Sequence, residues 1–371
     1  MERTFRAGSR DYGVGRVLVI AEIGTGHGGD PARAAELIAA AAAAGADCAK
    51  FQCVFADEIL HPLTGEVPLP GGSIRLYDRF KALELEAEFY AEAKAEVERR
   101  GMLFLCTPFG IRSARLLRGL GVCAMKVASP ELNHLPLLDE LASYGLPTIL
   151  SSGVSTLADI ERALARFGSG AQALLHCVTA YPAPESDYNL RLLPALASLF
   201  GLPVGVSDHS LDPVLVPALA AAVGGAVVEK HICLSRDRDG LDDPIALPPA
   251  DFATMVRALS EAERRGPDAT ISALRSEYGA DRVEAALGDG IKRLAPSEAA
   301  NYARTNRSIH ALRAIAAGET LCGDNLALLR TEKVLRPGLG PELLPAVLGR
   351  VARRNIPSGE GLEWEDVGDL A

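Results

Sequence analysis

Long apolar runs and paired cysteines are both missing from this sequence of 371 residues. The longest apolar run, Leu37 to Ala46, is alanine-rich and about half as long as a membrane-spanning helix requires. The first ten residues contain no apolar core of the kind found in signal peptides. The seven cysteines stand singly, without a CxxC pair that would bind zinc or exchange disulfides. We therefore expect a cytoplasmic protein with no membrane span, whose cysteines are mostly buried thiols.

An excess of basic residues is also missing. The chain carries 38 Lys and Arg residues against 48 Asp and Glu residues, a net charge of −10. This charge argues against nucleic acid as a partner, because a phosphate backbone needs a basic surface. It does not restrict small anions that bind in a local pocket. Hydrophobic residues make up 48% and charged residues 23%, which is the balance of a folded globular protein.

Short apolar strands alternate with longer helical segments along most of the chain. This alternation is typical of repeated β-α-β units with parallel strands. Eight such units within about 250 residues favour a closed (β/α)8 barrel, a TIM barrel, over an open sheet. The expected strands are Val17 to Glu22, Cys48 to Gln52, Leu103 to Thr107, Met125 to Val127, Thr148 to Ser151, Ala173 to His176, Val204 to Ser207 and Val227 to His231.

The chain is expected to divide into a large and a small domain. We assign residues 1–290 to the barrel, with an N-terminal hairpin in 1–15, residues 291–306 to a linker, and residues 307–371 to the small domain. Within the small domain, RAIAAGETLCGDNL from Arg313 and RNIPSGEGLEWEDV from Arg354 share Arg, Ile, Gly, Glu and Leu at identical spacing. This echo predicts two short strand-turn units related by pseudo-symmetry.

Polar residues occupy the carboxyl ends of the expected strands, where barrel enzymes carry their reacting groups. Two of them, Lys50 and Lys126, belong to the second and fourth strands. A buried ammonium is costly without an anionic partner, so this pair indicates a phosphorylated or carboxylated substrate. Serine hydroxyls at the same strand ends add donors for a phosphate. The alternative is a purely structural network in which the two lysines pair with Glu22 and Glu131.

Two histidines, His209 and His231, lie at the ends of the neighbouring seventh and eighth strands. Their imidazoles can converge on one divalent ion and leave its other positions open to water or substrate. Asp208 and Glu229, close to them in the sequence, are candidates to orient the two rings. The alternative is a pair of hydrogen-bonded core histidines without a metal.

Ten stretches of the chain, taken together and in order, resemble the N-acetylneuraminate (sialic acid) synthase family, which includes legionaminic, pseudaminic and spore-coat polysaccharide relatives. They are AEIGTGHGGD at Ala21, GADCAKFQ at Gly45, FLCTPFG at Phe104, MKVASPELNHLPLL at Met125, TILSSGVST at Thr148, HCVTAYPAP at His176, VGVSDHS at Val204, VEKHICL at Val228, ALGDGIKRLAPSE at Ala286 and RSIHALRAIAAGETL at Arg307.

The resemblance implies a TIM barrel followed by a small antifreeze-like (SAF) domain of the β-clip kind. It implies a C–C bond-forming transferase that condenses phosphoenolpyruvate with a sugar aldehyde, such as an N-acetylmannosamine-like aldose. The products are a sialic-acid-like 2-keto-3-deoxy acid and phosphate. The resemblance also implies a domain-swapped homodimer, in which the SAF domain of one subunit caps the active site of the other.

The resemblance further implies a role for individual residues. The residues expected to hold phosphoenolpyruvate are Lys50, Lys126, Ser129, Ser151 and Ser207, with Gln52 and Thr107 nearby. A divalent metal, manganese or magnesium, is expected on His209 and His231. Glu22 is expected to orient or deprotonate the attacking water, and Glu131 to assist it. The acceptor sugar is expected to contact Tyr181, Asp242 and, from the partner subunit, Arg336. The alternative for Arg336 is an exposed surface arginine without a role in the site.

The departures from the family pattern lie on the acceptor side. The common NHNG appears as Gly26-His27-Gly28-Gly29, and the common GPDH appears as Gly240-Leu241-Asp242-Asp243. An apparent insertion, Arg330-Thr331-Glu332-Lys333, makes Arg330 a rival of Arg336. We therefore expect the same chemistry on an acceptor other than N-acetylmannosamine.

Two other functions remain open at this stage. One is a phosphoenolpyruvate-dependent synthase that acts on a phosphorylated aldose, although no further pair of basic residues for a second phosphate stands at the strand ends. The other is a non-catalytic, sugar- or metabolite-binding descendant of the enzyme. Erosion of costly buried groups is expected in such a descendant, whereas Glu22, Lys50, Lys126 and both histidines are intact.

Overall fold

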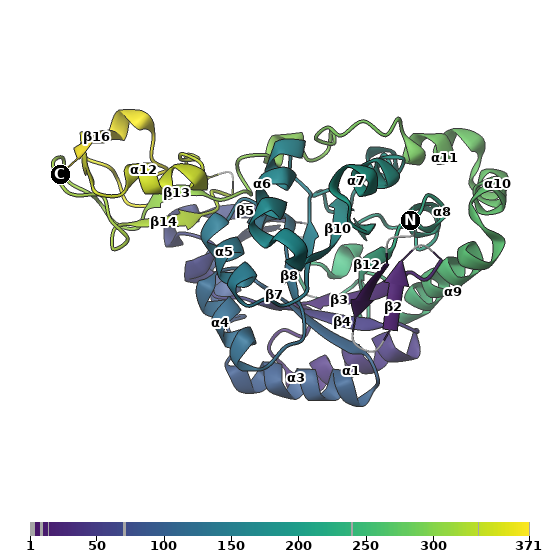
Figure 1. The fold of residues 1–371 in the computed structure, drawn as a ribbon. Helices are drawn as coiled ribbons and strands as arrows, with labels where there is room; N and C mark the ends of the chain where they lie inside the picture. The colour runs from purple at the N-terminus through teal and green to yellow at the C-terminus, as the bar shows by residue number, and fades with distance from the viewer. Residues whose placement is uncertain are drawn as a thin grey trace.

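The computed structural model describes residues 4–7, 10–13, 15–69, 72–238, 240–332 and 334–370. Eight parallel strands form one sheet in the order β7-β4-β3-β12-β11-β10-β9-β8, and the end strands β7 and β8 also lie against each other (Figure 1). The predicted (β/α)8 barrel is therefore confirmed. Its strands are β3 (Leu18–Gly24), β4 (Cys48–Cys53), β7 (Leu103–Pro108), β8 (Met125–Val127), β9 (Thr148–Ser151), β10 (Ala171–Cys177), β11 (Val204–Asp208) and β12 (Val227–His231).

Alternate strand residues fill the inside of the barrel, because successive side chains of a strand point to opposite faces. Leu18 and Ile20 of β3 pack with Ile149 of β9 and Leu175 of β10 in this inner layer. Val19, between the two β3 residues, belongs instead to the larger core between the strands and the helices. This alternation decides which polar residues at the strand ends face the mouth of the barrel.

Helices cover the outside of the barrel and pack their apolar stripes onto the strands. Local signals in the sequence begin several of them: Asp30 caps the first helix, and Thr156 and Asp159 form a capping box on another. The outer helices are α1 (Pro31–Ala43), α3 (Ala87–Arg99), α4 (Ile111–Gly119), α5 (Leu135–Ser143), α6 (Leu157–Phe167), α7 (Leu192–Phe200), α8 (Leu215–Ala222), α9 (Pro249–Arg265), α10 (Pro267–Tyr278) and α11 (Ala280–Leu287). A shorter helix, α2 (Leu76–Lys81), follows the small hairpin of β5 (Glu66–Leu69) and β6 (Gly72–Arg75).

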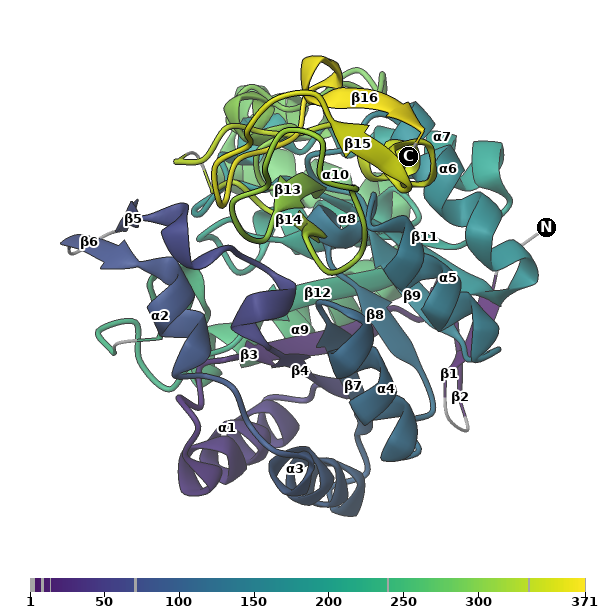
Figure 2. The ribbon, with the colours of Figure 1, turned by 90° about the vertical axis from the view of Figure 1, so that its left-hand side faces the viewer.

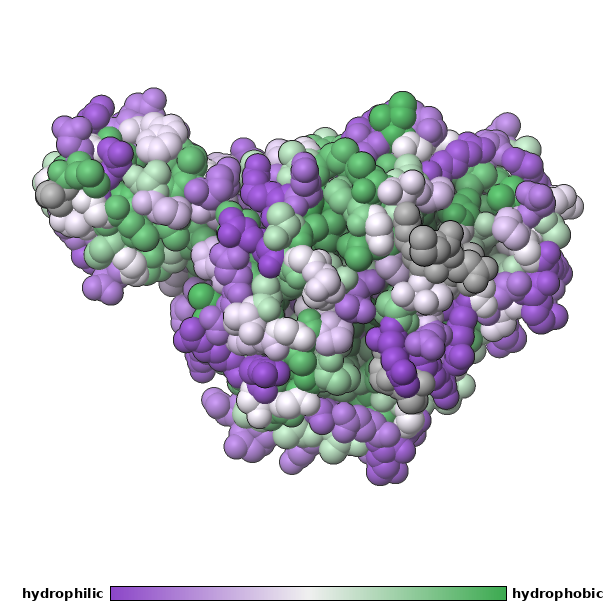
Figure 3. Space-filling view, viewed as in Figure 1, coloured by the Kyte–Doolittle hydropathy of each residue, from purple (hydrophilic) through white to green (hydrophobic). Residues whose placement is uncertain are grey.

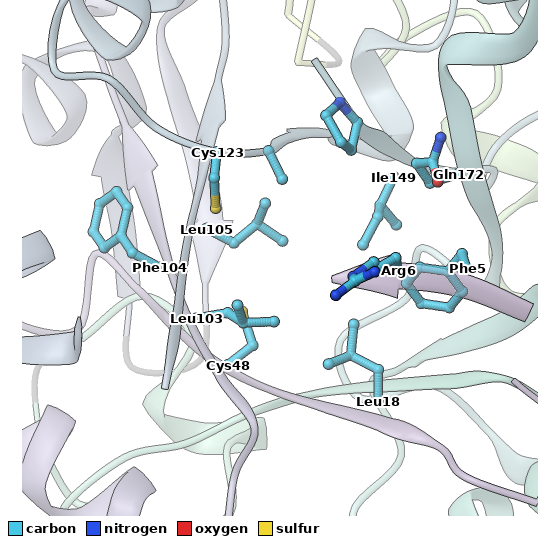
Figure 4. A pocket seen from close by; sticks show the side chains of 12 residues that line it. Phe5, Arg6, Leu18, Cys48, Leu103, Phe104, Leu105, Cys123, Ile149 and Gln172 are labelled. Atoms are coloured by element: carbon cyan, nitrogen blue, oxygen red, sulfur yellow. The ribbon is translucent and has the colours of Figure 1, made fainter. Parts of the chain in front are cut away.

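A hairpin of β1 (Thr4–Ala7) and β2 (Arg10–Gly13) packs on the amino-terminal end of the barrel. Phe5 and Tyr12 from this hairpin are buried in the inner layer. The pocket beside it is lined mainly by apolar side chains, with Arg6 as its charged member (Figure 4). That lining offers no acid-base pair for catalysis. Of the expected hairpin in 1–15, residues 1–3, 8, 9 and 14 lie outside the described residues.

The C-terminal domain stands as a separate lobe beside the barrel, joined to it by a narrower waist (Figures 1 and 3). Figure 2 shows this lobe from its outer side, in front of the barrel. It has an apolar core of its own, built around Ile309, Ile315 and Ile356. The predicted pseudo-symmetry is present, because Ile315 and Ile356, equivalent positions of the two echoing stretches, exchange backbone hydrogen bonds of 3.0 and 2.9 Å. Its two antiparallel strand pairs are β13 (Ser308–Ala311) with β14 (Leu326–Leu329), and β15 (Arg350–Ala352) with β16 (Val367–Leu370).

Two features expected from composition can be compared with the structure. Among the described residues, no helix combines the length and apolar character that a membrane crossing requires. All seven cysteines are free thiols, and five of them are buried, whereas Cys123 is exposed and Cys322 is half-buried.

Candidate active site

Charged side chains from four barrel strands, β3, β4, β8 and β12, meet at the carboxyl-terminal end of the barrel. The ammonium nitrogen of Lys50 lies 2.8 Å from Glu22 Oε2 and 3.5 Å from Glu229 Oε1. The ammonium of Lys126 lies 3.9 Å from Glu229 Oε2. All four side chains are buried. The structure thus brings together Lys50, Lys126 and Glu22, as the sequence predicts. The carboxylate of Glu229 lies between the two lysines.

The two lysines differ in how well their charge is compensated. Burial alone lowers the pKa of Lys50, but the nearby carboxylates of Glu22 and Glu229 outweigh burial and raise it. Burial lowers the pKa of Lys126 to about 8, because Glu229 offsets only part of this effect and Lys50 adds to it. The pKa of Glu229, which burial raises, is brought down to about 2 by Lys126 and Lys50. Lys126 is therefore a buried cation whose charge is only partly compensated, by Glu229 at 3.9 Å.

This geometry can be compared with the structural alternative, in which the two lysines pair with Glu22 and Glu131. Lys50 does pair with Glu22, as that alternative requires. Lys126, however, has no contact with Glu131, whose carboxylate binds Arg307 and Arg330 instead. A purely structural network would leave Lys126 poorly compensated, and a bound anion would supply the missing partner.

Hydroxyl and amide groups surround the charged cluster. Lys126 donates a hydrogen bond of 2.6 Å to Ser151 Oγ and one of 3.0 Å to the Val127 carbonyl. Ser207 Oγ donates to Glu229 at 3.1 Å, and Lys50 donates to Thr107 Oγ1 at 3.3 Å. Gln52 Nε2 donates to Glu22 Oε1 at 2.7 Å.

Ser129 lies in a tight turn on the same side of the barrel. Its Oγ accepts a hydrogen bond of 2.9 Å from the amide of Gly153. A Cβ atom at Gly153 would lie 2.2 Å from Thr179 Oγ1, 3.0 Å from Ser129 Oγ and 3.1 Å from Cys177 Sγ. Only glycine fits there, so the turns after β8, β9 and β10 are packed against each other. The donors expected around phosphoenolpyruvate thus come from neighbouring strand ends.

The two histidines lie beside this cluster with their ring centroids 5.6 Å apart. His209 Nδ1 is 2.8 Å from the Val178 carbonyl, a contact that places the proton of the neutral imidazole on Nδ1 and its lone pair on Nε2. His231 Nδ1 is 3.8 Å from Asp242 Oδ2. Among the described residues, no three His, Cys, Asp or Glu side chains are grouped as a complete set of metal ligands.

The expected ring-orienting role of Asp208 is wrong. Asp208 and Lys230 form a fully buried ion pair of 2.6 Å, and Asp208 also accepts from the Ser210 amide. Alternation along β11 and β12 turns these side chains away from the face that carries Ser207 and Glu229. The carboxylate of Glu229 contacts the two lysines and accepts a hydrogen bond from Ser207.

The acceptor candidates are spread over two regions. The Tyr181 ring stacks on His209 with centroids 4.3 Å apart and is 49% exposed, so it lies at the rim of the site. Asp242 lies next to His231. Arg336 lies inside the C-terminal domain, where its guanidinium contacts Glu363 at 3.1 Å and the Gly361 carbonyl at 2.7 Å. Arg336 is therefore not an unpaired surface arginine, because it binds a carboxylate and a carbonyl of its own domain.

Glu131 is fully buried and held by two arginines that follow it by more than 170 residues. Arg307 Nε donates to Glu131 Oε2 at 2.6 Å, and Arg330 donates to Oε1. Burial alone raises the pKa of Glu131, but the two guanidinium groups hold it well below its usual range. Sequence reasoning gave Arg307 no role, although it stands at the start of a quoted motif. Lys333, which follows Arg330 in the apparent insertion, lies outside the described residues.

Comparison with known protein families gives two matches. Residues 37–269 match the NeuB family, and residues 306–368 match the SAF domain. The chain is 31% identical to the N,N'-diacetyllegionaminic acid synthase of Legionella pneumophila, and the alignment covers 94% of each chain. It is 30% identical to the N-acetylneuraminate-9-phosphate synthase of Mus musculus, with 94% of this chain and 92% of the relative covered.

Solved structures also include relatives of this chain. The spore coat polysaccharide biosynthesis protein SpsE of Bacillus subtilis superposes with a TM-score of 0.82 at 31% identity, over 99% of this chain and 100% of that one. A 3-deoxy-D-arabino-heptulosonate 7-phosphate synthase from Thermotoga maritima, at 13% identity and a TM-score of 0.52, shares the fold alone.

Proposed function

The chain belongs to the NeuB family, and from this premise we propose that it condenses phosphoenolpyruvate with a sugar aldehyde. The products are a 2-keto-3-deoxy acid of the sialic-acid type and inorganic phosphate. The observation that carries the proposal is the buried cluster of Lys50 and Lys126 at the strand ends, because Glu229 at 3.9 Å compensates the charge of Lys126 only in part and phosphoenolpyruvate is an anion. The relatives named as synthases of legionaminic and sialic acids support the same reaction class.

The reaction forms one C–C bond and releases one phosphate. The C3 carbon of phosphoenolpyruvate attacks the aldehyde carbon, whose oxygen takes up a proton and becomes a hydroxyl. The cationic C2 centre then adds water and loses phosphate, so the oxygen of the new ketone comes from water. A site for this chemistry has to hold an anionic donor, exclude bulk water and stabilise a transient positive centre.

The residues around the lysines are suited to hold the donor. Lys50 and Lys126 supply positive charge, and the binding of an anion stabilises the charged form of Lys126. The hydroxyl and amide groups that line the same end are proposed as hydrogen-bond partners of its phosphate and carboxylate: Ser129, Ser151, Ser207, Gln52 and Thr107.

Glu22 is proposed to orient the attacking water. Its carboxylate is fixed on both sides, by Lys50 on one oxygen and by Gln52 on the other, so its position in the site is well defined. The positive C2 centre is also stabilised by a nearby carboxylate. Glu131 stays a prediction as a catalytic residue, because both of its oxygens are already bound by arginines.

A divalent metal, manganese or magnesium, is proposed on His209 and His231. The donor set fits, because the contact with the Val178 carbonyl directs the lone pair of the neutral His209 ring to Nε2, and the neighbouring His231 adds a second imidazole. When bound there, the metal would polarise the carbonyl oxygen of the acceptor. Two protein imidazoles leave positions for the aldehyde and for water.

For the acceptor, Tyr181 and Asp242 are proposed on this subunit and Arg336 on the partner of a domain-swapped homodimer. We further propose an acceptor other than N-acetylmannosamine, because Gly28 replaces an asparagine of the family pattern and Asp243 replaces its histidine. A cytoplasmic location belongs to the same proposal.

The test is phosphate release from phosphoenolpyruvate with manganese, measured against a panel of aldoses. The panel contains N-acetylmannosamine, its 6-phosphate and their deoxy diamino relatives. We expect release that depends on one class of unphosphorylated sugar other than N-acetylmannosamine. A clear preference for N-acetylmannosamine would refute the altered acceptor, preference for the 6-phosphate would favour the phosphorylated-aldose synthase, and silence across the panel with metal bound would favour a binding protein.

A further inference from the structure

Arg307 and Arg330 of the C-terminal domain reach into the barrel of their own chain. Together with Glu131 they form a buried ionic group in which every side chain is at most 9% exposed. His134 Nδ1 lies 3.4 Å from Glu131, and Glu332 lies 3.8 Å from Arg330. A carboxylate this deeply buried needs its cations, so the turn that carries Glu131 is tied to the presence of the C-terminal domain.

Arg307 also links the loops that follow three different strands. Its guanidinium donates to the Phe109 carbonyl at 2.7 Å, after β7, and to the Ile59 carbonyl at 3.3 Å, after β4. A further bond of 3.2 Å reaches the Leu328 carbonyl in β14 of its own domain. With Glu131 after β8, one side chain thus joins three loops at the carboxyl-terminal end of the barrel to the C-terminal domain.

The backbone contributes a second tie at the same place. Asn133 accepts a hydrogen bond of 3.0 Å from the Arg307 amide and donates one of 2.9 Å to the Arg307 carbonyl. The Arg330 amide donates to the Ile59 carbonyl at 3.0 Å. The turn from Ser129 to Asn133 is therefore fixed from the C-terminal side by both charged and neutral contacts.

The same turn carries a donor of the proposed phosphoenolpyruvate pocket. Ser129 lies two residues before Glu131, and its Oγ packs against Gly153, where even a methyl group has no space. Lys126 precedes Ser129 by three residues at the end of β8. A displacement of Glu131 would therefore also move Ser129. Because Ser129 packs closely on Gly153, this movement would disturb the packing between them.

We propose that Arg307 and Arg330 are positioning residues for the donor pocket, so that the C-terminal domain completes the phosphoenolpyruvate site of its own subunit. The contact runs within one chain, and it is distinct from the cap that the family resemblance places on the partner subunit. The proposal rests on the proposed function, since it names a further requirement of the same site.

The first test replaces Arg330 in the full-length chain. Arg330→Met leaves the Arg307–Glu131 pair in place, so the barrel is expected to fold. We expect its affinity for phosphoenolpyruvate, measured by calorimetric titration, to fall at least about tenfold, with KM for phosphoenolpyruvate raised more than KM for the sugar. Arg330→Lys should recover part of the loss. Arg313→Met, which removes an exposed ion pair of the same domain, is the matched control and should stay within about twofold of wild type.

A loss of thermal stability in Arg330→Met with unchanged phosphoenolpyruvate affinity would mean that the arginine is merely structural, and it would overturn the proposal. If this variant does not fold, Asn133→Ala decides by the same titration, because it removes the backbone tie without changing any charge.

Amide hydrogen exchange separates this proposal from the proposed function. Exchange in residues 129–133 should be at least about tenfold faster in Arg330→Met or Asn133→Ala than in wild type, with β10 and β11 unchanged. This readout needs no substrate. If wild type neither binds phosphoenolpyruvate nor releases phosphate, the proposed function fails while the exchange still reports on the turn. Unchanged exchange in both variants would overturn the positioning role.

Discussion

At the scale of single residues, two buried lysines of the barrel differ in their carboxylate partners. Lys230 lies 2.6 Å from Asp208, whereas Lys126 has its nearest recorded carboxylate, Glu229, at 3.9 Å. Lys126→Met should weaken phosphoenolpyruvate binding at least about 100-fold with little loss of unfolding free energy. Lys230→Met should lower the unfolding free energy by about 3–5 kcal/mol, because it leaves Asp208 buried without a cation. Calorimetric titration and denaturant unfolding measure the two effects, and equal destabilisation by both variants would make Lys126 structural.

The pKa of Lys126 predicts how donor binding depends on pH. Burial places this pKa at about 8, so the ammonium loses its proton as the pH rises through that value. The charged form attracts the anion, and kcat/KM for phosphoenolpyruvate should therefore fall above about pH 8. Lys126→Arg keeps its charge in this range, so any activity it retains should lack that alkaline limb. The same limb in both proteins would assign the titration to another group.

The sequence located most of the candidate site, because the carboxyl end of a barrel strand has a known place in the fold. Lys50, Lys126 and Glu22 meet there as expected. Two assignments depended on which way a side chain points. Asp208 was expected beside the histidines but faces Lys230, and Glu229 bridges the lysines. One-residue alternation along a strand decides such cases, and a strand end read from sequence is uncertain by more than that.

At the scale of elements, the eight strands were predictable and the connection between domains was not. Each strand is a short apolar run between turn signals, which is a local property of the chain. The contact of Glu131 with Arg307 joins residues 176 positions apart, and no local pattern indicates it. The family resemblance therefore gave Glu131 a catalytic role, although the structure surrounds it with arginines.

The hairpin of β1 and β2 is predicted to stabilise the barrel without contributing to its chemistry. Phe5 is buried in the inner layer at the floor, and the charged cluster lies at the other strand ends. Phe5→Ala should lower the unfolding free energy by about 3 kcal/mol, since it removes a buried aromatic ring. KM for phosphoenolpyruvate should stay unchanged under conditions where the variant is folded. A raised KM in the folded variant would show that the floor and the mouth are coupled.

At the scale of the whole molecule, the domain-swapped dimer predicts complementation between two inactive proteins. Lys126→Met lacks a donor site but carries an intact Arg336, and Arg336→Met carries the reverse. If Arg336 acts on the partner, a mixed dimer has one complete site. Subunits that mix at random should therefore recover about a quarter of the wild-type activity.

Activity that stays at the sum of the two separate variants would contradict a site shared between subunits. Sedimentation of the wild-type protein is the control for this experiment. A stable, active monomer would exclude the shared site independently, and it would leave the contact of Arg307 and Arg330 with their own barrel untouched.

The central claim is that phosphoenolpyruvate and a sugar aldehyde are joined by a C–C bond on this chain. The most direct measurement follows phosphoenolpyruvate labelled with carbon-13 at all of its carbons, with manganese and the sugar panel, by mass spectrometry of the acid product. The account predicts one labelled 2-keto-3-deoxy acid for each phosphate released, and neither product without the sugar or in Lys126→Met. Phosphate release without sugar, or without a labelled acid that contains the sugar carbons, would contradict it.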